Sequence, residues 1–265
     1  MDTLQTISPE PQPQNGNSLL FSLEQIARWK NNHVVDIPSL QRGLVWSPRQ
    51  VELFWDSVFR GFPVGSFAIT PVGNAPNQKH DSSNSEYFLL DGQQRYNAIV
   101  LGYNREDDPK AVLWLDLFPQ NIDKNSTRIF WFKVTTKAHP WGFANNDNCS
   151  LLGWKRYREA IQKFRNLDNE DDLSNTKVLK SLNLNNTWPI EAGCPIMLSS
   201  VFNCYDEASK TEKPEFVFEQ GIRDCLKNTG HDYKIDELNA TFIPRLYSAI
   251  RRLKKYRIVA KILSD

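Results

Sequence analysis

The sequence has few of the residues that build metal centres and disulfide frameworks. It has four cysteines, Cys149, Cys194, Cys204 and Cys225, and no Cys-x-x-Cys pair occurs among them. Scattered cysteines of this kind are typical of reduced thiols in a cytosolic protein, not of a zinc site. There is no apolar run of about 18 residues, so no membrane span is expected. Residues 1–17 lack the basic start and apolar core of a signal peptide, and we expect a cytoplasmic protein.

Two signatures of nucleic-acid and nucleotide binding are also missing. The formal net charge is only +1, so the chain has no overall basic character, although local basic patches remain compatible with this value. No Gly-x-x-x-x-Gly-Lys-Ser/Thr segment occurs, which excludes a P-loop. The chain does have 265 residues, 40% of them hydrophobic, and eight tryptophans. That is enough for one large domain or two small ones with a well-filled core.

The most informative segment is residues 88–95, which read Phe-Leu-Leu-Asp-Gly-Gln-Gln-Arg. The apolar residues 87–90 stop at Asp91, and apolar side chains then recur at helical spacing from Tyr96 to Tyr103. This pattern predicts a buried strand, a tight turn and a helix. The turn lies at the carboxyl end of the strand, where open α/β sheets bind ligands.

The side chains of this turn suit phosphate chemistry. Gly92 can adopt positive φ and let a ligand approach the backbone, and the first N–H groups of the helix can hold a phosphate. Asp91 supplies a carboxylate for a metal or a proton, and Arg95 supplies a planar fork for a phosphate. The alternative is a simply capped helix with a surface arginine. Gln93 and Gln94 argue against it, because a plain turn needs neither.

Two other loops carry polar residues beside a glycine. Gln41 and Arg42 precede a strong helix and can project into the same cleft, although an exposed loop arginine is an equal alternative. Gly65 and Ser66 lead into a strand at 67–70, and they can offer backbone N–H groups and a hydroxyl to a ligand. Gly65 is equally compatible with a bulge or close packing.

A second polar-aromatic cluster follows the strand predicted near residue 136. His139 is a candidate acid or base, or a base-stacking neighbour of Trp141. The alternative is that both residues pin a loop onto the core. Basic residues between Arg245 and Lys255 form either a solvated helix face or a DNA contact.

The remaining pattern predicts a mixed sheet flanked by helices, followed by a mainly helical C-terminal part. Strands are expected at 34–37, 67–70, 87–90, 111–117, 128–136 and 256–263. Helices are expected at 22–31, 47–61, 92–103, 151–164, 178–182, 216–226 and 236–255. The predicted division is a flexible arm at 1–20, a nucleotide-binding domain at 21–145 and a helical extension of that domain at 146–265.

Three motifs in order resemble the N-terminal domain of GmrSD-type restriction proteins, in the wider ParB/sulfiredoxin-like group. They are Pro-Ser-Leu-Gln-Arg-Gly-Leu-Val-Trp at 38–46, Trp-Asp-Ser at 55–57 with Gly-Phe-Pro-Val-Gly-Ser at 61–66, and Leu-Asp-Gly-Gln-Gln-Arg at 90–95. The resemblance covers residues 21–136. His-Pro-Trp-Gly at 139–142 is also similar to one branch of the family.

The resemblance implies a ParB/sulfiredoxin-like α/β (α+β) fold that binds and hydrolyses nucleoside triphosphates with Mg²⁺. It also implies a role in bacterial defence against phage, in which the domain controls the cleavage of modified DNA. The predicted catalytic residues are Asp91, Gln93, Gln94 and Arg95, with Asp91 also the candidate metal ligand. The predicted nucleotide-binding residues are Gln41, Arg42, Gly65, Ser66, Gly92, His139 and Trp141.

The chain departs from larger family members in one respect. They often carry a His-Asn-His nuclease domain, whereas none of the four histidines here has that spacing. The expected partners are therefore DNA and a separate nuclease subunit, and a homodimer stays open. The rival function is a non-enzymatic ParB-like DNA-binding module. A metal-dependent DNA nickase is weaker, because no acidic or histidine cluster accompanies Asp91.

Overall fold

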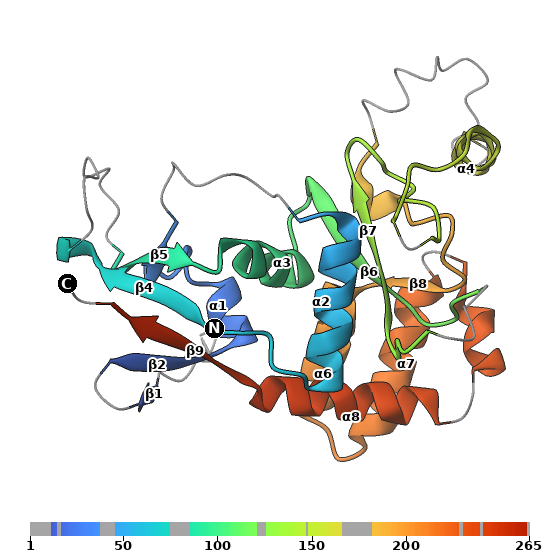
Figure 1. The fold of residues 1–265 in the computed structure, drawn as a ribbon. Helices are drawn as coiled ribbons and strands as arrows, with labels where there is room; N and C mark the ends of the chain where they lie inside the picture. Colours follow the sequence, from blue (N-terminus) through green and yellow to red (C-terminus); the bar gives the residue numbers. More distant parts are fainter. Residues whose placement is uncertain are drawn as a thin grey trace. The chain divides into compact units, whose positions relative to one another are not determined.

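The computed structural model (Figure 1) folds into two compact units. It describes residues 12–14, 17–37, 46–74, 85–120, 126–146, 148–165, 182–227, 230–238 and 241–263. Unit 1 comprises Met1–Val45, Pro63–Val100 and Arg252–Asp265, and unit 2 comprises Trp46–Phe62 and Leu101–Arg251. Neither unit begins or ends near residue 145, where the sequence suggests a domain boundary.

Unit 1 is built on a six-stranded mixed sheet of order β1-β2-β9-β4-β5-β3. Its strands are β1 (Gln12–Gln14), β2 (Ser18–Ser22), β3 (Val35–Asp36), β4 (Phe67–Pro71), β5 (Tyr87–Asp91) and β9 (Arg257–Ile262). The final strand β9 lies between β2, to which it is antiparallel, and β4, to which it is parallel. Figure 1 shows β9 beside β2. Residues 18–20, expected in a flexible arm, therefore belong to the sheet.

The helices of unit 1 begin where the sequence predicts. α1 (Leu23–Ala27) has a complete capping box between Ser22 and Gln25, but it ends about a turn earlier than predicted, and residues 28–33 form turns. α3 (Gln93–Tyr103) follows β5, and a short 3₁₀ turn, η1 (Val72–Asn74), follows β4.

The core of unit 1 gathers around the buried indole of Trp29. Its ring meets Phe21 edge-on at 5.1 Å and Phe67 at 4.9 Å, and it stacks on Tyr96 at 6.0 Å between ring centroids. Phe67 begins β4 and Tyr96 lies on α3. This cluster therefore fixes the start of α3 against the sheet.

Unit 2 contains a separate antiparallel sheet of order β7-β6-β8. Its strands are β6 (Ala111–Asp116), β7 (Trp131–Thr136) and β8 (Pro195–Met197). The prediction that β6 and β7 join the earlier strands in one sheet is wrong. β7 pairs along the whole of one edge of β6, from Ala111–Thr136 to Asp116–Trp131, and β8 pairs at the other edge. Both edges of β6 are thus occupied.

The first helix of unit 2, α2 (Pro48–Arg60), confirms the sequence prediction at both ends. Ser47 and Gln50 form a capping box with Pro48 in the first turn, and Gly61 ends the helix in the left-handed conformation. The predicted apolar stripe is the buried face of the helix: Val51, Phe54, Trp55, Val58 and Phe59.

The other elements of unit 2 confirm its largely helical character. They are α4 (Trp154–Arg165), η2 (Leu184–Asn186), α6 (Leu198–Ala208), α7 (Pro214–Lys227), η3 (Asp232–Glu237) and α8 (Phe242–Lys255). α8 begins later than predicted, because η3 occupies the residues before it. Helix α6 was not predicted from the sequence. Its N-cap, Met197, makes no side-chain capping bond. The turn predicted at 178–182 falls mostly outside the described residues. Among the described helices, none has the length and apolar character to cross a membrane.

Candidate functional site

The predicted strand, turn and helix around Asp91 are present in unit 1. β5 ends at Asp91, Gly92 has φ 104°, and α3 begins at the next residue. A Cβ atom on Gly92 would lie 2.4 Å from a ring carbon of Phe67. Both the backbone conformation and the space available therefore require glycine at this position.

Arg95 holds the carboxylate of Asp91 in place. Its Nη2 donates to Asp91 Oδ2 at 3.0 Å, and its Nη1 donates to the carbonyl of Val64 at 3.4 Å. The guanidinium carbon lies 5.4 Å from the centroid of the Phe67 ring. The Asp91 side chain is 76% exposed, whereas that of Arg95 is only 19% exposed. The carboxylate thus faces solvent, and its partner is fixed against the protein.

The loop before β4 also contacts Arg95. Gly65 has φ 88°, and a Cβ atom there would lie 2.3 Å from Arg95 Nη1. The Val64 N–H donates to the hydroxyl of Tyr256 at 3.3 Å. The structure therefore supports the interpretation that Gly65 allows close packing. Ser66 is half-buried beside it.

The first turn of α3 adds backbone donors to the same place. The first N–H groups of a helix have no acceptor within the helix, and they carry partial positive charge. Here they follow directly on Asp91, and the Tyr96 N–H closes the first turn on the carbonyl of Gly92 at 2.9 Å. Gln93 and Gln94 are half-buried in this turn. The arrangement combines anion-binding amides with an exposed carboxylate.

The chemistry of this turn limits how Mg²⁺ fits it. Within the described ranges, no group of three or more His, Cys, Asp or Glu residues is placed to hold a metal. Mg²⁺ usually keeps several waters and binds through one or two carboxylates together with substrate phosphates. Asp91 therefore fits a cation shared with a bound polyphosphate, and not a metal site made by protein alone.

Comparison with known families shows which family the chain belongs to. A family model described as GmrSD restriction endonuclease, N-terminal domain, matches residues 23–256. The chain belongs to this family. Membership gives it a restriction-related role. No match was found among curated proteins.

The match to the GmrSD N-terminal domain is longer than the resemblance at 21–136, and it includes all of unit 2. Of the predicted site residues, Gln41 and Arg42 lie outside the described residues. His139 and Trp141 belong to unit 2, whereas the Asp91 turn belongs to unit 1.

In this GmrSD domain, His139 and Trp141 pin a loop to the core of unit 2. Trp141 is buried and meets Tyr157 edge-on at 5.1 Å, and burial lowers the pKa of the half-buried His139. Both residues line a cavity of about 500 Å³, together with Trp154 and Tyr157. The aromatic ring most open to solvent here is that of Trp154, not Trp141.

Trp154 begins α4 and is 64% exposed. Its ring stacks on Tyr157 at 6.1 Å, and the Arg158 guanidinium carbon lies 4.8 Å from its centroid. Lys155 and Arg156 are exposed beside it. The signal in the sequence is the run Trp-Lys-Arg-Tyr-Arg, which interleaves aromatic and basic residues as stacking surfaces for nucleic acid do.

A buried charged cluster in unit 2 was not expected from the sequence. Burial raises the pKa of Glu52 to about 7. Cys149 Sγ donates to Glu52 Oε2 at 3.5 Å, and Arg128 Nη1 lies 3.8 Å from the same oxygen. Arg128 also covers the Trp131 ring at 4.9 Å. These contacts tie α2 to the segment around β7, so we assign the cluster a structural role.

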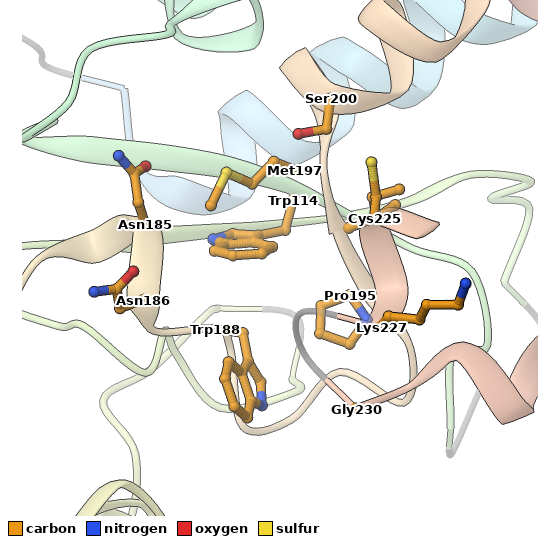
Figure 2. Close-up of a pocket in the computed structure, with 11 residues that line it drawn as sticks. Trp114, Asn185, Asn186, Trp188, Pro195, Met197, Ser200, Cys225, Lys227 and Gly230 are labelled. Atoms are coloured by element: carbon orange, nitrogen blue, oxygen red, sulfur yellow. The ribbon is translucent and has the colours of Figure 1, made fainter. Parts of the chain in front are cut away.

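Unit 2 also has a cavity of about 650 Å³, shown in Figure 2. Its wall is formed by Trp114, Asn185, Asn186, Trp188, Pro195, Ile196, Met197, Ser200, Cys225, Lys227 and Gly230. Trp114 donates to Thr135 Oγ1, and the Asn185 amide nitrogen donates to the carbonyls of Glu106 and Asp107. These polar groups of the cavity wall are therefore already hydrogen-bonded within the protein.

Proposed function

We propose that unit 1 binds a nucleoside triphosphate at the Asp91 turn and hydrolyses it. This step regulates a bacterial restriction system directed against phage, in which the chain acts with DNA and a separate nuclease subunit. The observation that carries the proposal is the exposed Asp91 carboxylate, held by Arg95 at the N-terminus of α3. Phosphoryl transfer needs charge neutralisation and an aligned water more than covalent chemistry.

Each residue of the turn has a distinct proposed task. The amides of the first turn of α3 hold phosphate oxygens. Asp91 orients the attacking water or shares Mg²⁺ with the phosphates, and the side chains of Gln93 and Gln94 position the water. Arg95 fixes Asp91 and adds positive charge beside the phosphates. Bound Mg²⁺ would supply further neutralisation of phosphate charge.

The glycines and the earlier loop support this site. Gly92, at φ 104°, lets the chain turn from Asp91 into α3 with the Phe67 ring packed against it, so the first amides of the helix follow directly on the carboxylate. Gly65 leaves room for the Arg95 guanidinium, and Ser66 adds a hydroxyl to the same loop. Gln41 and Arg42 are proposed to face the nucleotide on the strength of the family resemblance.

The test is phosphate release by the purified chain with each of the four nucleoside triphosphates and Mg²⁺. We expect turnover in the wild type and a loss of about a hundredfold or more in Asp91→Asn. Asp236→Asn is the matched control, because Asp236 is 73% exposed and pairs with Arg223 at 3.1 Å. Equal activities of the two variants, or no turnover in the wild type with and without DNA, would reject the assignment.

A non-enzymatic DNA-binding module is the second candidate. The exposed Trp154 with Arg158 against it favours this reading, because such rings stack on unpaired bases. The exposed basic residues Arg251 and Lys255 near the end of α8 would contact phosphates. Steeply salt-dependent DNA binding without turnover, weakened in Trp154→Ala, would favour this function. Plasmid nicking with Mg²⁺ would favour the nickase instead.

A further inference from the structure

Two cysteines of unit 2 lie in contact although 21 residues separate them. Cys204 lies on α6 and Cys225 on α7, and their Sγ atoms are 3.7 Å apart. Gly221, one turn before Cys225, allows this approach, since a Cβ atom there would lie 3.1 Å from Cys204 Sγ. The thiols therefore face each other across a tightly packed helix pair.

One of the two thiols borders the large cavity. Cys225 lines the cavity of about 650 Å³, and Figure 2 shows its side chain on the wall near Ser200 and Lys227. Both cysteines of the pair are only half-buried. By contrast, Cys149 and Cys194 are buried, and neither makes contact with a second cysteine.

The protonation of the pair also differs from that of the other cysteines. The hydrogen bond between the two thiols lowers the pKa of Cys225 to about 7, and the same bond raises the pKa of Cys204. The carboxylate of Asp224 opposes the effect on Cys225. Burial raises the pKa of Cys149 and of Cys194 to about 12. The direction of these shifts favours a thiolate, the reactive form, at the pair over Cys149 and Cys194.

We propose that Cys204 and Cys225 are a redox modification site, at which a peroxide converts the dithiol into a disulfide that joins α6 to α7. This inference does not depend on nucleotide hydrolysis at the Asp91 turn. It rests on the contact of the two sulfurs, on their partial exposure, with Cys225 lining the cavity, and on the burial of the other two cysteines of the unit.

The chemistry needs one molecule of hydrogen peroxide for each disulfide. The Cys225 thiolate attacks a peroxide oxygen, the O–O bond breaks, and hydroxide leaves, which gives a sulfenic acid. The Cys204 sulfur then attacks the sulfenic sulfur. The S–O bond breaks, the S–S bond forms, and the hydroxyl leaves as water with the proton of Cys204. The two sulfurs together lose two electrons, and the hydroxide is protonated by solvent, so the peroxide becomes two waters.

The test uses the full chain treated with hydrogen peroxide at neutral pH. Remaining thiols are blocked with N-ethylmaleimide, and non-reducing digestion with mass spectrometry locates cross-links. We expect a cross-link between Cys204 and Cys225, a loss of two hydrogens in mass, two free thiols lost of the four, and full reversal by dithiothreitol. Cys149→Ser, which removes a buried thiol, should still form the cross-link, and Cys225→Ser should not.

A second measurement needs no variant and so does not depend on variant folding. The rate of alkylation at each cysteine of the wild type is followed by mass spectrometry in native buffer. We expect Cys225 to react at least tenfold faster than Cys149 and Cys194. Equal rates at the cysteines, or oxidation of Cys225 to sulfinic acid with Cys204 left free, would overturn the proposal.

Discussion

Arg95, in the first turn of α3, donates from Nη2 to Oδ2 of Asp91, the last residue of β5, at 3.0 Å. An ion pair with one partner this exposed contributes only about 0–1 kcal/mol to stability. Its position at the N-terminus of α3 is therefore of more consequence than its energy. Arg95 also bonds the carbonyl of Val64, so one side chain links the turn, the helix and the loop before β4.

Arg95→Lys should lower turnover at least tenfold. Lysine keeps the positive charge but lacks the planar fork that contacts Asp91 and Val64 together. The free energy of unfolding should change by less than about 1 kcal/mol. Steady-state kinetics and urea denaturation measure the two effects, and Arg223→Lys, which alters the pair with Asp236, is the control. Unchanged turnover in Arg95→Lys would show that the charge alone suffices.

Gly65→Ala and Gly92→Ala should both impair the site, for different reasons. A Cβ atom on Gly65 displaces the guanidinium of Arg95, so turnover should fall, and the positive φ of Gly65 should also cost about 1 kcal/mol of stability. A Cβ atom on Gly92 meets the Phe67 ring at positive φ, so unfolding should become easier by about 1–3 kcal/mol. Gly153→Ala, where nothing lies within 4 Å, is the control. Wild-type stability of Gly92→Ala would contradict this geometry.

Glu52 should make stability depend on pH. Burial raises its pKa from 4.5 to about 7, so the folded chain binds a proton in a range where the unfolded chain has lost it. The stabilisation that protonated Glu52 contributes is therefore lost as pH rises through that range. Above the range, Glu52 no longer changes the free energy of unfolding with pH. Between pH 5 and 8 the stability of the wild type relative to Glu52→Gln should fall by about 2–3 kcal/mol.

Denaturant unfolding of both proteins across this pH range isolates the effect of Glu52. Other titrating groups, such as Asp116, whose pKa burial also raises, are present in both proteins and cancel in the difference. A difference in stability that stays constant with pH would mean that Glu52 titrates normally.

Asp116→Ala should destabilise unit 2 by at least about 3 kcal/mol. The buried carboxylate accepts from the N–H groups of Phe118, Gly193 and Cys194 at 3.1, 3.1 and 2.8 Å. Removing it leaves these three donors without their acceptor. Thermal or urea unfolding measures the loss, and Glu207→Ala, at an exposed position, should be nearly neutral. A similar effect of both substitutions would contradict a structural role for Asp116.

Features encoded within a few residues were predictable. The capping box of Ser47 and Gln50, Pro48 in the first turn and Gly61 at the end determine α2. The change at Asp91 from an apolar run to helical spacing likewise predicts β5, the turn and α3. α6 was missed although Leu198, Val201, Phe202 and Tyr205 recur at helical spacing, and its N-cap makes no side-chain capping bond that would mark its start.

The sequence by itself determined the local elements, the Asp91 turn and the family relationship, because capping, glycine conformation and motif order are properties of neighbouring residues. Only the tertiary structure decided which strands pair. It placed β9 between β2 and β4, and it assigned β6 and β7 to a second sheet. It also brought Val64 to Arg95 and Cys204 to Cys225. These contacts join residues far apart in the chain, and the packing of the whole unit selects them among many alternatives.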